Sequence, residues 1–409
     1  MRAMIAGGGT GGHVFPGIAI AEEVVGRHPD NDVVFVGTSR GLEARVVPEA
    51  GFPIELIDVK GLKGKGPWSL FANLLLLPVA FVQSWRLLRR WRPDIVVGVG
   101  GYASGPVVLA ARLLGIPTAV QEQNALPGFT NRVLGIFAQA AFTAFPEAGR
   151  HFARRKVYQL GNPIRRQLLE NYMRPSSVHD ALRVLVFGGS QGAHALNMRV
   201  VEALPHLHDL RERVLFTHQT GARDREQVER GYRAVGFEPD VREFITDMSG
   251  AYAGADLVVC RAGATTLAEL TVCKKPSILI PFPHAADNHQ VMNAKSLVDA
   301  GAAVMIEEKD LTGEVLADEI RAILKAPERR ERMSRAAGLL GSPQAAGEIA
   351  DVCTELVRRR FGSQRGQDRG TEFRPVRPRL PPAEASRLGP QTSDPDLESD
   401  PSASNLPEA

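Results

Sequence analysis

A glycine cluster and one histidine near the start of the chain could together handle negative charge and protons. The run Gly7-Gly-Gly-Thr-Gly-Gly12 follows a short apolar stretch, and His13 precedes a segment with helical spacing of apolar residues, 18–25. A strand that turns tightly into a helix exposes backbone N–H groups at the positive end of the helix dipole, which attracts anions. Glycines let a phosphate or a sugar approach that backbone closely. The imidazole can act there as a general base, because its ordinary pKa lies near neutrality.

Two later loops repeat this chemistry. The loop Gly188–Ala193 offers backbone N–H groups together with a serine hydroxyl, a combination that suits phosphate. The segment Arg261–Glu269 predicts a helix start that Thr265 and Thr266 cap. The carboxylate of Glu269 then lies one turn inside that helix, where it can accept hydrogen bonds from both hydroxyls of a ribose. A diphosphate on the helix start would complete a nucleotide site.

Further polar side chains are expected in the same cleft. The fragment Gln121-Glu-Gln-Asn124 follows a strand-like run, and the loop 281–290 can supply groups that bind hydroxyls. Arg165 follows Gly161-Asn-Pro-Ile164, the expected hinge between two domains, and its guanidinium can bind phosphate there. Structural roles stay open for these groups: a surface ion pair for Arg165, and a capping and dipole role for Glu269.

The first loop also matches the G-x-G-x-x-G pattern of dinucleotide-binding domains, through Gly7, Gly9 and Gly12. That pattern requires an acidic residue at the end of the next strand to hold a ribose. The corresponding run ends Phe35-Val-Gly-Thr-Ser-Arg40, without an acid. NAD binding is therefore disfavoured, and a purely structural tight turn remains open.

Alternating strand-like and helix-like runs provide the elements that position these groups. Apolar, β-rich runs form two series, at 4–6, 33–36, 95–99, 118–121 and 141–144, and again at 183–187, 214–217, 241–244, 257–260, 277–280 and 303–306. This alternation is typical of parallel sheets with helices on both faces. We predict an α/β protein with two Rossmann-like, doubly wound domains that face a cleft, with ligands at the carboxyl ends of the strands.

The predicted domain boundary gives an N-terminal domain of residues 1–163 and a C-terminal domain of residues 164–343. A polar linker is expected at 172–180, just after this boundary. A last helix is predicted at 344–360. Residues 361–409 carry too few apolar side chains to bury a core, so we predict a disordered tail.

The composition limits the classes of function. A chain of 409 residues can form two domains, and 44% hydrophobic and 23% charged residues are typical of a soluble globular protein. The net charge of +3 is too small to indicate nucleic-acid binding by itself. Cys260, Cys273 and Cys353 form no paired metal or disulfide pattern, which fits a reducing cytoplasm. The first predicted strand begins at the N-terminus, so we expect no signal peptide.

The segment 60–92 differs from the rest of the chain. It holds all three tryptophans and no acidic residue, and its apolar centre, 70–82, is too short for a spanning helix, which needs roughly 20 residues. Basic residues that flank an apolar, tryptophan-bearing segment are typical of an interfacial membrane contact. A buried helix with a solvated basic flank is the alternative. The expected contact residues are Trp68, Leu75, Trp85, Arg86 and Arg89.

Five fragments occur in the same order in one known family: Gly7–Pro16, Gln121–Asn124, Gly161–Arg165, Gly188–Ala193 and Cys260–Glu269. Through them, the chain up to about residue 360 resembles the MurG family. These bacterial transferases add N-acetylglucosamine to the lipid-linked muramyl-pentapeptide precursor in peptidoglycan synthesis. The resemblance implies the GT-B architecture, with two Rossmann-like domains, a deep cleft and a final helix that returns to the first domain.

By that resemblance the donor is UDP-N-acetylglucosamine, bound mainly by the second domain. Its uracil is expected beside Phe244 and Ile245, and its ribose on Glu269. Its diphosphate is expected near Ser190 and the helix start, and its sugar near Gln290. The full set of implied donor-binding residues is Thr10, Gly11, Gly12, Asn124, Arg165, Ser190, Ile245, Ala264, Thr265, Thr266, Glu269 and Gln290.

The implied reaction inverts the anomeric configuration, as the muramyl 4-hydroxyl of undecaprenyl-diphospho-muramyl-pentapeptide (lipid I) attacks the donor to give lipid II. His13 is the expected general base, with Glu122 as the second candidate. Helix N-termini and Arg165 would stabilise the leaving diphosphate, so we expect neither a metal nor another cofactor. The early Asp30-Asn-Asp32 looks like a turn before a strand and not a metal-binding Asp-x-Asp.

The resemblance also implies a peripheral protein on the cytoplasmic side of the cell inner membrane. Its partners would be the polyprenyl-linked acceptor, the anionic inner-leaflet surface and other cell-wall synthesis proteins, with no nucleic acid. Three alternatives stay open: a lipid galactosyltransferase of similar build, a UDP-N-acetylglucosamine epimerase that needs no membrane contact, and a non-catalytic nucleotide-sugar binding protein.

Overall fold

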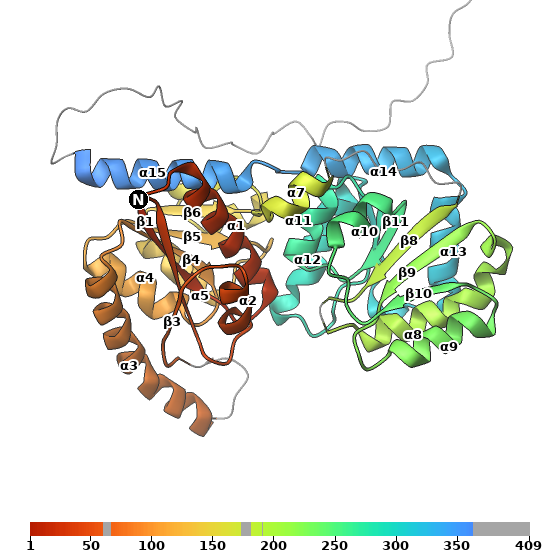
Figure 1. Cartoon of the computed structure of the whole chain (residues 1–409), viewed down its shortest axis with the longest axis horizontal. Coiled ribbons are helices and arrows are strands. Elements are labelled where there is room, and N and C mark those ends of the chain that lie inside the picture. Colours follow the sequence, from red (N-terminus) through yellow and green to blue (C-terminus); the bar gives the residue numbers. More distant parts are fainter. Residues whose placement is uncertain (60–66, 173–180, 190, 363–409) are drawn as a thin grey trace, which may run out of the picture.

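Two parallel sheets lie side by side in the computed structural model, which describes residues 1–59, 67–172, 181–189 and 191–362 (Figure 1). The strand orders are β3-β2-β1-β4-β5-β6-β7 and β10-β9-β8-β11-β12-β13. Neighbouring strands of both sheets run parallel to each other. In each sheet the first strand lies near the centre. The next strands are added on one side of it and the later strands on the other side, which is the doubly wound topology. The predicted fold class is therefore confirmed.

The first lobe is built on the seven-stranded sheet. Its strands are β1 (Arg2–Gly7), β2 (Asp32–Gly37), β3 (Ile54–Leu56), β4 (Ile95–Gly100), β5 (Thr118–Glu122), β6 (Ala140–Thr143) and β7 (Val157–Gln159). Its helices are α1 (Gly11–Arg27), α2 (Glu43–Glu49), α3 (Pro67–Trp91), α4 (Ser104–Leu113), α5 (Phe129–Phe137), α6 (Pro146–Gly149) and the 3-10 turn η1 (Arg154–Lys156).

The second lobe begins with α7 (Arg166–Tyr172), which packs against α10 (Met248–Gly254). Its strands are β8 (Leu182–Phe187), β9 (Val214–Gln219), β10 (Pro239–Arg242), β11 (Leu257–Cys260), β12 (Ser277–Leu279) and β13 (Ala303–Met305). Its helices are α8 (His194–Ala203), η2 (Leu204–Leu210), α9 (Arg225–Ala234), α10 (Met248–Gly254), α11 (Ala264–Val272), η3 (Ala286–Asn288), α12 (His289–Asp299), η4 (Glu308–Asp310), α13 (Gly313–Leu324) and α14 (Pro327–Leu340).

The strand predictions differ from the structure in three places. Strand β10 ends at Arg242, so the run 241–244 is predicted too far along the chain. The sequence does not predict β3 and β7. Each has three residues and lies at an edge of the first sheet, where the side chains are only partly buried. Such strands lack the continuous apolar run that identifies a buried strand.

Alternation along β1 explains how the first sheet becomes buried on both faces. Ala3 and Ile5 pack in one apolar cluster with α1 and α15 (Ala345–Gly362). Met4 and Ala6 point the other way, into a cluster with residues of α3 and α4. Successive side chains of a strand point to opposite faces, so a fully apolar strand needs helices on both sides.

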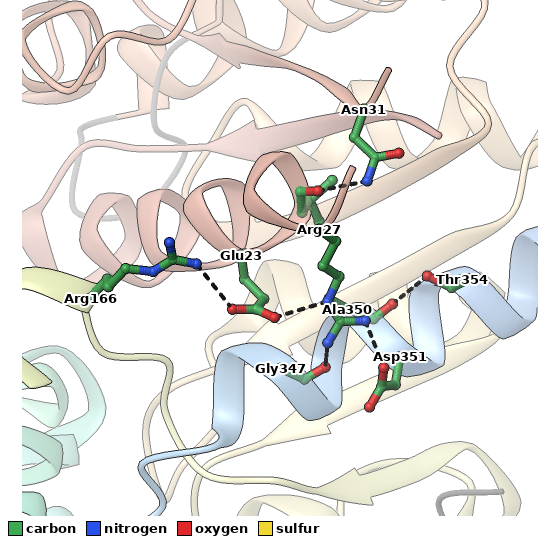
Figure 2. A network of polar contacts seen from close by, with 9 residues as sticks. Glu23, Arg27, Asn31, Arg166, Gly347, Ala350, Asp351 and Thr354 are labelled. Atoms are coloured by element: carbon green, nitrogen blue, oxygen red, sulfur yellow. Dashed lines mark hydrogen bonds and ion pairs between the residues drawn. The ribbon is translucent and has the colours of Figure 1, made fainter. Parts of the chain in front are cut away.

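Helix α15 follows α14 of the second lobe and packs along α1 of the first lobe (Figure 1). Arg27 of α1 donates hydrogen bonds to the carboxylate of Asp351 at 2.6 Å and to the carbonyl of Gly347 at 2.7 Å (Figure 2). It also donates to Glu23 at 2.9 Å, and Glu23 pairs with Arg166 of α7 at 3.7 Å. This network ties α1 and α15 to the start of α7, the first helix of the second lobe.

Several predicted features lie outside the described residues: residue Ser190, the linker residues 173–180, the segment 60–66 and the tail from residue 363. Trp68 and Leu75 lie in α3, but nothing is described of their side chains. In the part of the chain that the structure covers, no helix is both long and apolar enough to cross a bilayer.

Candidate active site

Helix α12 of the second lobe contacts the loop that follows β5 of the first lobe. The side chain of Asn293 on α12 is fully buried and accepts a hydrogen bond from the backbone N–H of Ala125 at 2.8 Å. It also donates to Asn124 Oδ1 at 3.1 Å and to the carbonyl of Ala262 at 3.3 Å. Helices α1 and α11 are in contact as well. The helices that follow the first glycine loop and the third predicted loop therefore lie against each other.

His13 is held in a defined tautomer. Its Nδ1 lies 3.2 Å from Gln123 Oε1, and the amide nitrogen of Gln123 donates to the carbonyl of Val99 at 2.9 Å. Because Oε1 can only accept, Nδ1 carries the proton, and Nε2 of the neutral ring keeps a lone pair. Burial lowers the pKa of His13, although the charge of Glu122 opposes this shift. The ring is therefore neutral near pH 7 and can accept a proton at Nε2.

Glu122 is buried and its carboxylate is engaged on both oxygens. One oxygen accepts from the backbone N–H of Asn124 at 2.9 Å and from its side chain at 3.2 Å. The other accepts from the N–H of Gly128 at 3.1 Å and from Asn131 Nδ2 at 2.9 Å. Four donors fix this carboxylate, so its evident function in the fold is to shape the loop after β5.

Glu269 lies on α11 in a different environment. Its side chain is 9% exposed and accepts a hydrogen bond at 3.0 Å from the hydroxyl of the fully buried Tyr252. Burial raises the pKa of Glu269 to about 6, while the charge of Arg165 and the hydrogen bond from Tyr252 act in the opposite direction. A buried carboxylate with few donors is a strong acceptor for ligand hydroxyls.

The predicted threonine cap of α11 is wrong. The helix begins at Ala264, its N-cap is Gly263 in an extended conformation, and no side chain caps it. Thr265 and Thr266 therefore lie within the first turn and not before it. The buried hydroxyl of Thr265 has no hydrogen-bond partner among the described residues. The uncapped first turn has backbone N–H groups without intrahelical partners, which suits an anion.

Arg165 and Gln290 are two further predicted donor-binding residues. The guanidinium of Arg165 stacks over the ring of Phe15 on α1, 4.6 Å from its centroid, and its charge acts on Glu269. Gln290, on the first turn of α12, accepts a hydrogen bond from the N–H of Phe282 at 2.9 Å. Arg165 therefore lies between Phe15 of the first lobe and Glu269 of the second.

Gln219 is a site residue that the sequence does not identify. Its amide nitrogen donates to the carbonyl of Gly189 in the second glycine loop at 2.8 Å, and its oxygen accepts from the N–H of Ile245 at 2.8 Å. Ile245 is buried, whereas the ring of neighbouring Phe244 is 56% exposed. The signal in the sequence is a glutamine two residues after the predicted strand run 214–217.

Glu43 is the second residue missed, and it changes the interpretation of the first glycine loop. Its carboxylate, 1% exposed, accepts from the N–H of Gly9 at 2.6 Å and from Thr38 N and Oγ1, both at 2.9 Å. The N–H of Gly8 donates to the carbonyl of Gly100 at 3.2 Å. The expectation of bare amides throughout this loop is therefore wrong at Gly8 and Gly9. Glu43 is the first residue of α2 and lies beyond the end of β2, where the dinucleotide-binding pattern requires its acid.

The structure places Arg165 within electrostatic reach of Glu269 and joins Asn124 to α12 by a hydrogen bond. Thr10 is the N-cap of α1 and is exposed, and Gly11 and Gly12 form its first turn beside His13. Trp85, Arg86 and Arg89 lie apart from this site on α3, which packs against α4. Within the described residues, no group of three or more His, Cys, Asp or Glu side chains could hold a metal ion.

Comparisons with known proteins agree with this geometry. A model of the glycosyltransferase family 28 N-terminal domain matches residues 3–143, and a model of the family's C-terminal domain matches residues 183–349. A curated relative from Anaeromyxobacter dehalogenans is 80% identical over 92% of this chain and 99% of its own length. One from Myxococcus xanthus is 62% identical over 88% and 94%. Both are named UDP-N-acetylglucosamine–N-acetylmuramyl-(pentapeptide) pyrophosphoryl-undecaprenol N-acetylglucosamine transferase.

Solved structures show the same architecture. A crystal structure of Acinetobacter baumannii MurG superposes with a TM-score of 0.71 at 33% identity, covering 87% of this chain and 99% of the other. A UDP-GlcNAc 2-epimerase from Neisseria meningitidis, bound to UDP-GlcNAc, gives a TM-score of 0.63 at 13% identity and covers 87% of this chain and all of the other. The likeness to the epimerase concerns the fold alone.

Proposed function

The chain belongs to glycosyltransferase family 28 and, within it, to the MurG transferases, and from this premise we propose that it converts lipid I to lipid II. The reaction moves N-acetylglucosamine from UDP-N-acetylglucosamine to the 4-hydroxyl of undecaprenyl-diphospho-muramyl-pentapeptide. The observation that carries this proposal is the 80% identity with a transferase of that name over nearly its whole length.

We propose that the second lobe, residues 164–343, binds the donor. The ribose hydroxyls donate to Glu269, whose buried carboxylate has few other donors. The diphosphate lies on the uncapped first turn of α11, residues 264–266, and near Ser190. The uracil lies beside Ile245 and the exposed ring of Phe244, and Gln290 contacts the sugar.

We propose that His13 removes the proton from the acceptor hydroxyl. The hydroxyl oxygen attacks the anomeric carbon, its proton passes to His13 Nε2, and the bond from that carbon to the UDP oxygen breaks with its electron pair on UDP. Attack opposite the leaving group inverts the configuration. The defined tautomer of His13 favours this role, and the four donors on Glu122 favour a positioning role for that residue. A general base typically contributes about 10²- to 10⁴-fold.

The leaving diphosphate carries growing negative charge. The first turn of α11 and the guanidinium of Arg165 direct positive potential toward it. Asn124 and the first turn of α1, residues 10–12, border the same site from the first lobe. We therefore expect transfer to continue in the presence of a chelator.

We propose that the first lobe, residues 1–163, binds the acceptor and the membrane, and that the helix predicted at 344–360 joins the two lobes. The guanidinium of Arg89 lies 5.5 Å from the ring centroid of Trp85 on α3, a pairing that suits an interface with anionic lipid. Arg86 follows on the same helix. The protein would then act on the cytoplasmic side of the inner membrane, where other cell-wall synthesis proteins could reach it.

The decisive assay uses radiolabelled UDP-N-acetylglucosamine and a short-chain lipid I analogue, with and without chelator. We expect labelled disaccharide product in both conditions. A diacylglycerol acceptor should give no product, and UDP-N-acetylglucosamine alone should give no epimer. Transfer to diacylglycerol or epimerisation, without transfer to the lipid I analogue, would overturn the proposal.

A further inference from the structure

The buried side chain of Arg261 joins the carboxyl ends of three neighbouring strands of the second sheet. Arg261 directly follows β11, and its guanidinium donates to the carbonyls of Ile280 and Pro281 after β12, both at 3.2 Å. It also pairs with Glu308 on η4, which follows β13. The guanidinium carbon lies 5.5 Å from the ring centroid of Phe282. One buried cation therefore fastens the start of the loop after β12 to its neighbours.

The loop that Arg261 fastens is mostly exposed. Residues 282–284, 287 and 288 are exposed, so this segment buries little apolar surface of its own. Asp287 and Asn288 have a left-handed backbone, with φ of +53° and +56°, which is uncommon for residues other than glycine. Such a conformation persists where the surrounding structure holds it. The shape of this loop therefore depends on polar anchors, and Arg261 supplies those at its start.

The fastened segment in turn orients Gln290, which is half-buried in the first turn of α12. The backbone N–H of Phe282 donates to Gln290 Oε1 at 2.9 Å. With that oxygen engaged, the amide nitrogen is the group that Gln290 retains for a ligand, and it can only donate. Because Arg261 binds the carbonyl of Pro281 and the ring of Phe282, it fixes the backbone that sets the direction of this amide.

Stability alone is a weak reason for this ion pair. The side chain of Arg261 is 10% exposed and that of Glu308 is 25% exposed. Taking two charges out of water offsets much of their attraction, so apolar residues of similar volume often give equal stability. The planar guanidinium, however, fixes the directions of several hydrogen bonds at once, which a lysine cannot reproduce. These properties favour a geometric role.

We propose that Arg261 is a positioning residue for glycosyl transfer, which holds the loop after β12 so that the amide nitrogen of Gln290 faces the donor sugar. The inference rests on the proposed function for the contact between Gln290 and that sugar. Arg261 acts through Gln290 and needs no contact with the donor. Since the nucleotide is assigned to Glu269 and the start of α11, losing Arg261 should affect the sugar and spare the nucleotide.

The test is a double-mutant cycle of R261K and Q290A. R261K keeps the charge but loses the planar fork, so it should lower kcat/KM for UDP-N-acetylglucosamine about 5- to 10-fold. The Kd for UDP, measured by calorimetry, should stay within about twofold of wild type. Q290A should lower kcat/KM at least as much. Adding R261K to Q290A should cause no further loss, because the group that Arg261 positions is gone.

The E308Q variant provides the same test without changing Arg261. It removes the charge partner of the guanidinium at a less buried position and keeps the shape of the side chain. We expect a smaller loss in kcat/KM, which should also vanish in the Q290A background. E308Q decides the question if R261K does not fold.

The matched control is R329K, the same chemical change at another arginine of the second lobe. Arg329 on α14 pairs with Glu319 on α13, and their side chains are 32% and 25% exposed. R329K should leave kcat/KM and the Kd for UDP at their wild-type values. A loss in R329K equal to that in R261K would show a general effect of weakening the lobe and would overturn the proposal.

Four other outcomes separate the possible failures. Equal losses of UDP affinity and kcat/KM in R261K, multiplied effects in the double variant, or no effect of either R261K or E308Q would each overturn the role of Arg261. Wild-type kinetics in Q290A would overturn the sugar contact and, with it, the route through Gln290. If wild type transfers nothing to the lipid I analogue, the proposed function fails instead. The cycle is then decided by the affinity for UDP-N-acetylglucosamine relative to UDP.

Discussion

The buried glutamates of the two lobes are satisfied to very different degrees. In the first lobe, Glu43 and Glu122 accept three and four hydrogen bonds within the described part of the chain. In the second lobe, the hydrogen bond that Glu269 accepts among the described residues comes from Tyr252, and burial raises the pKa of Glu269 to about 6. Well-satisfied groups fix a geometry, whereas under-satisfied groups retain capacity for a ligand. We therefore propose that the first lobe is preorganised for catalysis and the second for binding.

The largest expected effect comes from removing the base of the preorganised lobe. H13A should lower kcat by about 10²- to 10⁴-fold, because the acceptor hydroxyl loses its proton acceptor. The KM for UDP-N-acetylglucosamine should stay within a small factor of wild type, since donor binding belongs to the other lobe. Steady-state kinetics with a lipid I analogue measure both constants. H28A, at an exposed histidine on the same lobe, is the matched control.

The E122Q variant tests whether Glu122 acts as the general base or only positions its loop. If Glu122 only shapes its loop, the variant loses stability in urea but still shows an acidic limb in the pH–rate profile, because that limb belongs to His13. The limb should move to lower pH, since the charge of Glu122 no longer raises the pKa of His13. A variant with native stability and the kcat of H13A would reverse the two assignments.

The second largest effect tests the binding lobe. E269A should raise the KM for UDP-N-acetylglucosamine, because hydrogen bonds to a charged group contribute about 1.5–3 kcal/mol, or roughly 10- to 150-fold. The kcat at saturating donor should change little by comparison. Calorimetry with UDP checks the loss directly. A large fall in kcat at unchanged donor affinity would contradict the division of labour between the lobes.

The candidate residues of the second lobe are closer together in the sequence than those of the first, and this makes their arrangement easier to predict. Glu269 and the start of α11 lie in one short segment, so spacing alone places them together. His13 instead depends on Gln123, and the first glycine loop on Glu43, through contacts between distant segments. Asn293 likewise joins α12 to a loop of the other lobe. Such contacts leave no local pattern in the sequence.

Local detail failed where a shift of one residue matters. The small residues before α11 correctly indicate a helix start, but they do not say whether Gly263 or a threonine is the cap. The family resemblance could supply the roles of Thr265 and Glu269, yet the unsatisfied hydroxyl of Thr265 and the raised pKa of Glu269 follow only from burial.

The next effect concerns stability and its dependence on pH. The pKa of Glu269 is higher in the folded state, about 6, than its ordinary value of 4.5, so its ionised form costs folding free energy. This cost is absent below the ordinary pKa and fully present above pH 6. E269Q should therefore be more stable than wild type by up to about 2 kcal/mol at pH 8 and equally stable at pH 4. Urea denaturation at both pH values measures the difference.

Asp247 provides a control of opposite sign. It caps α10, and the N–H of Gly250 lowers the pKa of its carboxyl. D247N should lose stability at pH 8, and that loss should shrink as the pH falls below the ordinary pKa. If E269Q and D247N changed stability in the same direction at pH 8, Glu269 would not be an under-satisfied group.

The smallest effect tests whether the first lobe carries the membrane contact. Each basic residue near an anionic leaflet contributes about 1 kcal/mol, so replacing Arg89 together with Trp85 should weaken liposome binding about fivefold or more. UDP binding should not change, because α3 lies on the lobe that does not hold the donor. Co-sedimentation with vesicles rich in anionic lipid measures the first quantity, and R45A, at an exposed arginine of α2, is the control. Unchanged vesicle binding would mean that α3 serves the core alone, with Trp85 packed against it.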